Sequence, residues 1–366
     1  ADAVGLSISF NALAWLLSYF IKFDFTFATL HWVIIFLFSL LIIGWIYHLI
    51  RFKPRFSPAS VLAALAALMI LALGVWWRIE QAKTLIFPAW VDSVHHSLIV
   101  RVLQEQGHLV GTLRPYMAVP FAYHYSFHAL TAMAATLTGL NPSDSILWFG
   151  QLINALIGLS VYRLAIALWA DWRKGLLTAL LVTFALHLPA YYLTWGRYTL
   201  SIGLVMLPLA MASLIDTLRK PTLARWIELL VLTAGVVLSH LTALLLFGVF
   251  AFFALLVHML QRSSLSSPAT QPWQKWGPLL AAALATLNAL ALTSPWLYRL
   301  WGVYSMQARI STVPFTDSSQ VSYLQYIWTL LGPNSSYFWL ILGACGLLWS
   351  FFHRKDLAFS LWGLVI

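Results

Sequence analysis

Long apolar segments recur along the whole chain and are separated by short polar stretches. A run of about 20 apolar residues is the length that an α-helix needs to cross a bilayer. We therefore predict an all-α fold, a polytopic transmembrane helical bundle with about nine to eleven spans. The candidate spans are 4–21, 30–50, 59–77, 145–169, 174–193, 198–217, 225–260, 277–296 and 336–352, with a partial span from 357.

Clusters of Lys and Arg lie in short loops between these segments. Loops of this kind stay on the cytoplasmic side of a membrane. We therefore expect 78–120 and 297–325 to lie outside. The loops placed in the cytoplasm are 51–55, 171–174, 219–225 and 353–355.

Two segments do not fit a simple alternation of spans. Residues 121–140 are apolar enough to cross, yet a crossing would put the basic loop 171–174 outside. We expect this segment to lie at the outer interface, or to dip in and return. Residues 225–260 are too long for one span, so we expect the chain to go out and come back with a turn near Ser239 and His240.

The pattern divides the chain into three regions. Residues 1–77 form N-terminal transmembrane helices, and 78–140 form a first large outer loop with interfacial or re-entrant, membrane-parallel amphipathic helices. Residues 141–366 form a transmembrane helical bundle. The segment after 357 is too short for a complete crossing, so we expect the native protein to continue at its C-terminus.

Composition supports a membrane protein. Hydrophobic residues make up 61% of the 366 residues and charged residues 9%, against about 25% charged in soluble domains. Mean hydropathy is +0.84, and a large soluble helical domain would need a polar surface that these residues cannot supply. The net charge of +10 comes from loops between spans, so it indicates orientation and not nucleic-acid binding. The single cysteine excludes an intramolecular disulfide.

The stretch WVDSVHHSL places an acid and two histidines directly after an apolar run. Pro88 suits the first turn of an amphipathic helix on the outer surface, with an apolar stripe at Val91, Val94, Leu98 and Val102. On this helix Asp92 faces His95 and His96, three and four residues later, so all three can act on one small volume. The alternative is a purely structural role. Asp92 would then stabilise the start of the helix through the helix dipole, and the two histidines would lie at the interface in contact with water.

Other polar residues converge on the same outer face. His124 and His128, four residues apart, would line the mouth of a pocket, although aromatic residues and histidines are common at interfaces. Arg197 follows Gly196 at the start of a span. It either snorkels to lipid headgroups or binds a phosphate that the glycine lets approach the backbone. His240 lies in an apolar stretch, where it is functional or is hydrogen-bonded between helices.

A metal site is a further interpretation of this acid and the two adjacent histidines. Asp92, His95 and His96 supply three ligand types at helical spacing, with Glu80, Glu105 or His108 nearby. The spacing is not HExxH, and adjacent histidines point about 100° apart on a helix. We expect no metal or other cofactor, with a divalent ion as the alternative. The sequence also lacks a Gly-rich phosphate loop, a GxSxG elbow and a CxxCH haem motif.

Three features together resemble a known family: a large first outer loop with an acid on an amphipathic helix, the segment WGRYTLSIGL (195–204) and the segment LSHLTALL (238–245). Over roughly 75–300 the chain is similar to the bacterial integral-membrane glycosyltransferases of the GT-C superfamily. The resemblance implies an inverting transfer of sugar from a polyprenyl-phosphate donor, at the outer face of a prokaryotic plasma (inner) membrane. The partners would be a lipid-linked sugar donor and membrane lipids.

The resemblance also implies residue roles. The general base of that family matches Asp92. Arg197 would hold the donor phosphate, and His95, His96 and His240 would orient substrate or stabilise the departing phosphate. A sugar phosphate already has a good leaving group, so one base and a cation are the minimum that this chemistry needs.

Two other function classes stay open. The first is a non-catalytic subunit of a membrane complex that binds haem, quinone or pigment, for which only His187 and His240 are placed to face each other within the bilayer. This class would bring membrane-protein partners. The second is a transporter of an anionic lipid or solute.

Overall fold

The computed structural model describes residues 1–52, 57–264, 272–310, 335–354 and 356–366. Helices account for almost all regular structure there, and the described residues contain no β-strand beyond one isolated bridge between Thr112 and Pro120. The prediction of an all-α fold is confirmed. The segments 51–55, 297–325 and 353–355 of the sequence analysis lie partly outside the described residues.

Seven of the described helices are long and apolar enough to cross a membrane, and the predicted count of nine to eleven stays a prediction. They are α1 (Asp2–Ile21), α2 (Phe27–Phe52), α3 (Pro58–Ala82), α6 (Pro142–Trp169), α8 (Tyr198–Arg219), α10 (Leu241–Ser264) and α11 (Pro272–Ile310). The others are α4 (Asp92–Gln106), α5 (Ser126–Thr138), α7 (Trp172–Leu180), α9 (Leu223–Ser239), α13 (Ser335–Phe352) and α14 (Leu357–Val365), with a π-turn η1 (Leu181–Ala185) and a 3₁₀ turn η2 (Ala190–Trp195).

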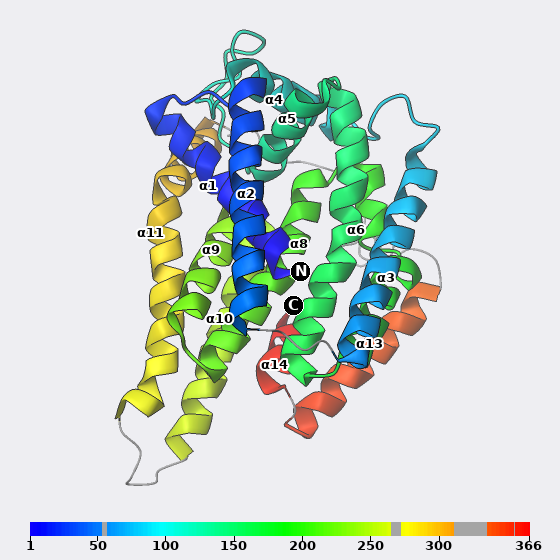
Figure 1. Cartoon of the computed structure of the whole chain (residues 1–366), viewed down its shortest axis with the longest axis vertical. Coiled ribbons are helices and arrows are strands. Elements are labelled where there is room, and N and C mark those ends of the chain that lie inside the picture. Colours follow the sequence, from blue (N-terminus) through cyan, green and yellow to red (C-terminus); the bar gives the residue numbers. More distant parts are fainter. Residues whose placement is uncertain (53–56, 265–271, 311–334, 355) are drawn as a thin grey trace.

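The core lies around α8, which packs between α6, α9 and α10 (Figure 1). Ile202, Val205 and Met206 on α8 are completely buried. By contrast, α2 exposes apolar side chains around its whole circumference and contacts mainly α5. An apolar helix exposed in this way suits a lipid environment.

The basic segments gather at one end of the bundle. Arg219 at the end of α8 donates to the carbonyl oxygens of Ala167 and Leu168 at the end of α6. Trp169 Nε1 donates to Asp356 Oδ2 at 2.8 Å, which joins the segment after α13 to the same end. The described residues of the loops 171–174, 219–225 and 353–355 therefore lie at the same end of the bundle.

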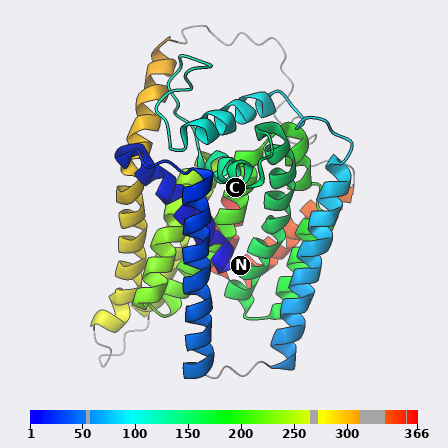
Figure 2. The same ribbon diagram turned by 45° about the horizontal axis from the view of Figure 1, so that its top comes forward.

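The opposite end carries α4 and α5, which both belong to the segment 78–140. Figure 2 shows α4, in cyan, running crosswise to the long helices α2 and α3. Helix α5 has 13 residues, about 20 Å, and ends at Gly139 with φ +70°, so it is too short to cross. Residues 121–140 thus stay at this end of the bundle, and α6 starts back from it.

The 225–260 segment also turns where expected. Helix α9 ends at Ser239 and α10 begins at Leu241, with His240 extended between them at φ −165° and ψ 135°. Arg225, near the start of α9, donates to the carbonyl oxygen of Asp216 near the end of α8. The chain therefore runs from the basic end to the α4 end and back, with His240 at the turn.

Candidate functional site

The polar residues predicted for one face meet beneath α4. They come from the start of α4, from the 121–125 segment and α5, from the Gly196–Arg197 turn before α8, and from the break between α9 and α10. Four separate parts of the sequence thus supply one cluster at the end of the bundle opposite the basic loops.

Helix α4 begins later than the sequence suggested. Pro88 precedes the helix, Trp90 has φ +74°, and Asp92 is the first helical residue. The helix buries Ser93, His96 and Val100, while Val91 and Val94 of the predicted apolar stripe are exposed. Val102 of the same stripe is buried and Leu98 packs, partly buried, against the core. The predicted stripe is therefore packed only in its second half, and the start of α4 packs through the face that carries His96.

Gly196 lets the turn before α8 approach the start of α4 closely. It has φ +60°, and a Cβ there would lie 2.9 Å from Ser93 Oγ and 3.3 Å from the carbonyl oxygen of Ala89. Only glycine accepts both this backbone conformation and this contact. The close approach fixes Arg197, the residue before α8, next to the start of α4.

Asp92 and Arg197 form an ion pair. Arg197 Nη1 lies 3.3 Å from Asp92 Oδ2, and both side chains are partly exposed, at 46% and 36%. An ion pair with this exposure contributes about 0–1 kcal/mol, so it is easily exchanged for another partner. The acid and the cation that the sequence analysis selected separately therefore face the same small region.

His96 and His128 form a buried pair. His96 Nδ1 lies 2.8 Å from His128 Nε2, His96 Nε2 lies 3.0 Å from the carbonyl oxygen of Gly196, and His128 Nδ1 lies 3.1 Å from that of His124. Both carbonyl oxygens can only accept, so each outer nitrogen must carry a proton, and the contact between the rings needs one more. Three contacts require three ring protons, whereas two neutral imidazoles carry two.

Burial acts against that third proton. It lowers the pKa of the His96 imidazole to about 4 and the pKa of His128 well below its ordinary value, because a charged ring loses hydration. The hydrogen bond to Gly196 and the negative charge of Asp92 raise the pKa of His96, whereas the positive charge of Arg197 lowers it further. At neutral pH the two rings together thus carry no charge. The three contacts would all be hydrogen bonds if the pair took up a third proton, and an anion nearby would favour that protonated state.

His124 and His240 form a second histidine contact. Their ring centroids are 4.8 Å apart, and burial lowers the pKa values to about 3 and about 4. His240 Nδ1 accepts from the Thr242 backbone N–H at 3.1 Å, whereas His124 Nδ1 is buried without a hydrogen-bond partner among the described residues. Gly203 provides the room, since a Cβ there would lie 2.8 Å from His240 Cβ.

Two predicted residues do not join the cluster. His95 is exposed, whereas its neighbour His96 is buried, so of the two adjacent histidines only His96 lies inside the cluster. His187 packs against Tyr191 at 4.3 Å between ring centroids, while His240 packs against His124. The two histidines considered for haem therefore have different neighbours.

Tyr123 was not selected from the sequence, although it lies among the histidines. Its ring centroid lies 5.0 Å from that of His124 and 5.8 Å from that of His128, and its hydroxyl oxygen lies 3.5 Å from Thr199 Oγ1. The pattern YHYSFH contains two tyrosines. Tyr125 is completely buried and donates to the carbonyl oxygen of Ala12, so only the backbone geometry distinguishes the two.

The alternative metal ligands are engaged elsewhere. Glu80 pairs with Lys83, Glu105 with Arg101, and His108 with Asp24. Within the described part of the chain, no three His, Cys, Asp or Glu side chains are grouped so that they could hold a metal ion.

Comparison with known proteins adds no relative. No protein family matches the chain, and no curated protein and no solved structure is significantly similar to it.

Proposed function

We propose that the chain is a membrane glycosyltransferase that moves a sugar from a polyprenyl-phosphate donor to an acceptor, with inversion, at the end of the bundle that carries α4. One observation supports it most: an acid and an arginine, paired at 3.3 Å, lie at the rim of a buried histidine cluster in an apolar helical bundle. The site faces away from the basic loops, so the reaction would take place at the outer face of a prokaryotic inner membrane.

The transfer needs one base and one cation. The Asp92 carboxylate takes the proton of the acceptor hydroxyl while the acceptor oxygen attacks the anomeric carbon. The bond from that carbon to the phosphate oxygen breaks, and its electron pair leaves with the polyprenyl phosphate. A single displacement inverts the anomeric centre, and Arg197 binds the departing anion through its planar fork of donors.

The partly exposed ion pair of Asp92 and Arg197 is consistent with this exchange. Arg197 can leave Asp92 for a phosphate at little cost because the pair is partly exposed. That movement frees the carboxylate to act as a base at the moment the donor is in place. The His96–His128 pair then gains the anion that favours its third proton and so stabilises the phosphate charge.

The test is transfer by the purified protein in detergent with a panel of radiolabelled polyprenyl-phosphate sugars. We expect Asp92→Asn to lose at least about 100-fold in rate, the scale of a removed general base. Asp24→Asn is the matched control, since Asp24 is a carboxylate at the same end that pairs with His108. Full activity in Asp92→Asn, or no transfer by folded wild type with any donor, would contradict the proposal.

A further inference from the structure

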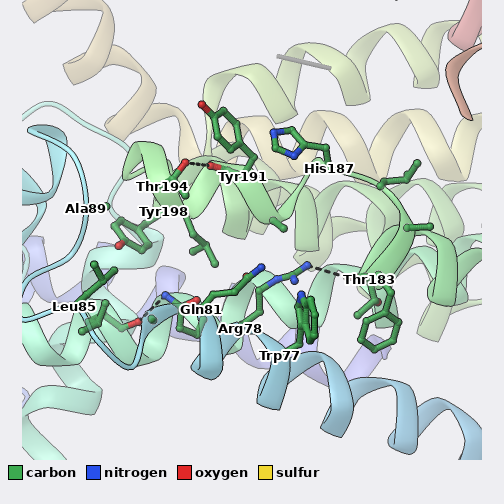
Figure 3. Close-up of a pocket in the computed structure, with 18 residues that line it drawn as sticks. Trp77, Arg78, Gln81, Leu85, Ala89, Thr183, His187, Tyr191, Thr194 and Tyr198 are labelled. Atoms are coloured by element: carbon green, nitrogen blue, oxygen red, sulfur yellow. Dashed lines mark hydrogen bonds between the residues drawn. The ribbon is translucent and has the colours of Figure 1, made fainter. Parts of the chain in front are cut away.

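A cavity of about 380 Å³ lies beside the histidine cluster, between α3, α6 and the irregular segment that contains η1 and η2. Figure 3 shows Trp77 and Arg78 of α3 on one side, with His187 and Tyr191 on the other. Tyr198, at the start of α8, borders both the cavity and the cluster.

Arg78 is a buried cation held only by neutral groups. Its side chain is 1% exposed. Nε donates to Asn154 Oδ1 at 2.9 Å and Nη2 donates to the carbonyl oxygen of Thr183 at 3.0 Å. Asn154 is fixed in turn, because its Nδ2 donates to the carbonyl oxygen of Pro189 at 3.0 Å. The network holds the guanidinium in place without neutralising it.

No counter-charge accompanies this arginine in the described structure. Arg78 takes part in none of the described ion pairs, and none of the described residues lining the cavity is acidic. A guanidinium stays protonated in proteins, and a buried charge without a partner costs several kcal/mol. Its third nitrogen, Nη1, makes no hydrogen bond among the described residues, so it can donate to a ligand.

Three of the exposed residues that line the cavity are apolar. Trp77, Leu85 and Phe184 line it and are 46%, 41% and 41% exposed. Arg78 lies four residues before the end of α3, about 6 Å along the axis, which is a suitable depth for a lipid headgroup. An occupant would thus place an oxyanion at Arg78 and an alkyl chain along the exposed rim.

We propose that this cavity is an anion site for a phosphate-bearing amphiphile, with Arg78 as its receptor. The site does not depend on the proposed transfer reaction, since it is defined by binding alone. Gln81 also lines the cavity and is exposed one turn after Arg78. A carboxylate there would supply the missing counter-charge and compete with the ligand.

The experiment measures binding of dodecyl phosphate and of inorganic phosphate to the full chain in uncharged detergent. Arg78→Gln removes the cation, and Gln81→Glu neutralises it while leaving the buried network intact. The controls are Arg101→Gln and Gln106→Glu, which make the same charge changes at exposed positions of α4. Melting temperatures show that each variant is folded.

We expect dodecyl phosphate to bind wild type and both controls alike. Binding should weaken by at least about tenfold in Arg78→Gln and in Gln81→Glu, the scale of a lost charged hydrogen bond. Weaker binding of inorganic phosphate than of dodecyl phosphate would identify a lipid headgroup, and equal binding a free phosphate. Absent saturable binding, or unchanged binding to folded Gln81→Glu, would overturn the proposal.

Discussion

The histidines at the site are neutral because they are buried, and that neutrality stabilises the fold only while the solution is not acidic. Burial lowers the pKa of His96 and of His240 to about 4, and that of His124 to about 3. An unfolded chain would protonate the same rings near pH 6.5. Their contribution is therefore complete above about pH 6.5 and is lost as the pH falls toward 4.

We expect the melting temperature of the purified protein to be lower at pH 5 than at pH 7.5, by about 5 °C or more. His124→Phe should reduce this difference, because His124 Nδ1 has no described partner and an apolar ring can take its place. Thermal unfolding in uncharged detergent at both pH values measures the effect. The same melting temperature at both pH values would contradict the argument.

Much of the cluster could be predicted at the scale of single residues. The orientation of the spans alone brought Asp92, His128, Arg197 and His240 to one end. The rotation of α4 could not be predicted, because it follows from the start of the helix at Asp92 and from the contact of Ser93 with Gly196. That rotation separates His95 from His96.

At the scale of helices, small residues set how closely α1, α8 and α9 approach. A Cβ on Gly235 of α9 would collide with Ser9 Oγ of α1 and lie 2.7 Å from Met206 Cε of α8. Helices in membranes gain stability from such close contacts, since lipid offers no hydrophobic advantage to larger side chains. The sequence contains these glycines without indicating which of them face a neighbour.

We expect Gly235→Ala to destabilise the protein by about 1–3 kcal/mol through overpacking. Gly248→Ala is the matched control in α10, where an added Cβ meets nothing within 4 Å. The control should be unchanged or slightly more stable, because alanine favours a helix. Melting temperatures of the two variants test the packing, and equal stability of both would show that α9 does not approach α1 as closely as described.

The irregular segment between α7 and α8 was the least predictable element. Residues 174–193 were expected to form one span, yet α7 ends at Leu180 and the chain continues as a π-turn, a bend and a 3₁₀ turn. The π-turn presents the carbonyl oxygen of Thr183 to Arg78, and Gly74 and Gly158 leave room for the Thr183 side chain. Periodicity shows an apolar run but not a tertiary contact that interrupts its helix.

For the whole molecule, the separation of charge between its two ends predicts how it sits in a membrane. Arg219 and Lys220 mark one end and α4 the other, and basic loops stay in the cytoplasm. Single cysteines at Gln106 and at Lys220, both exposed, report the two ends once Cys345 has been replaced by alanine.

We expect a membrane-impermeant maleimide, added to intact cells or right-side-out vesicles, to label Gln106→Cys and not Lys220→Cys. Opening the membrane with detergent should make Lys220→Cys reactive, which shows that the cysteine itself is accessible. Labelling of Lys220→Cys from outside would reverse the orientation. The site with Asp92 would then face the cytoplasm, and transfer to an acceptor at the outer face would no longer be possible.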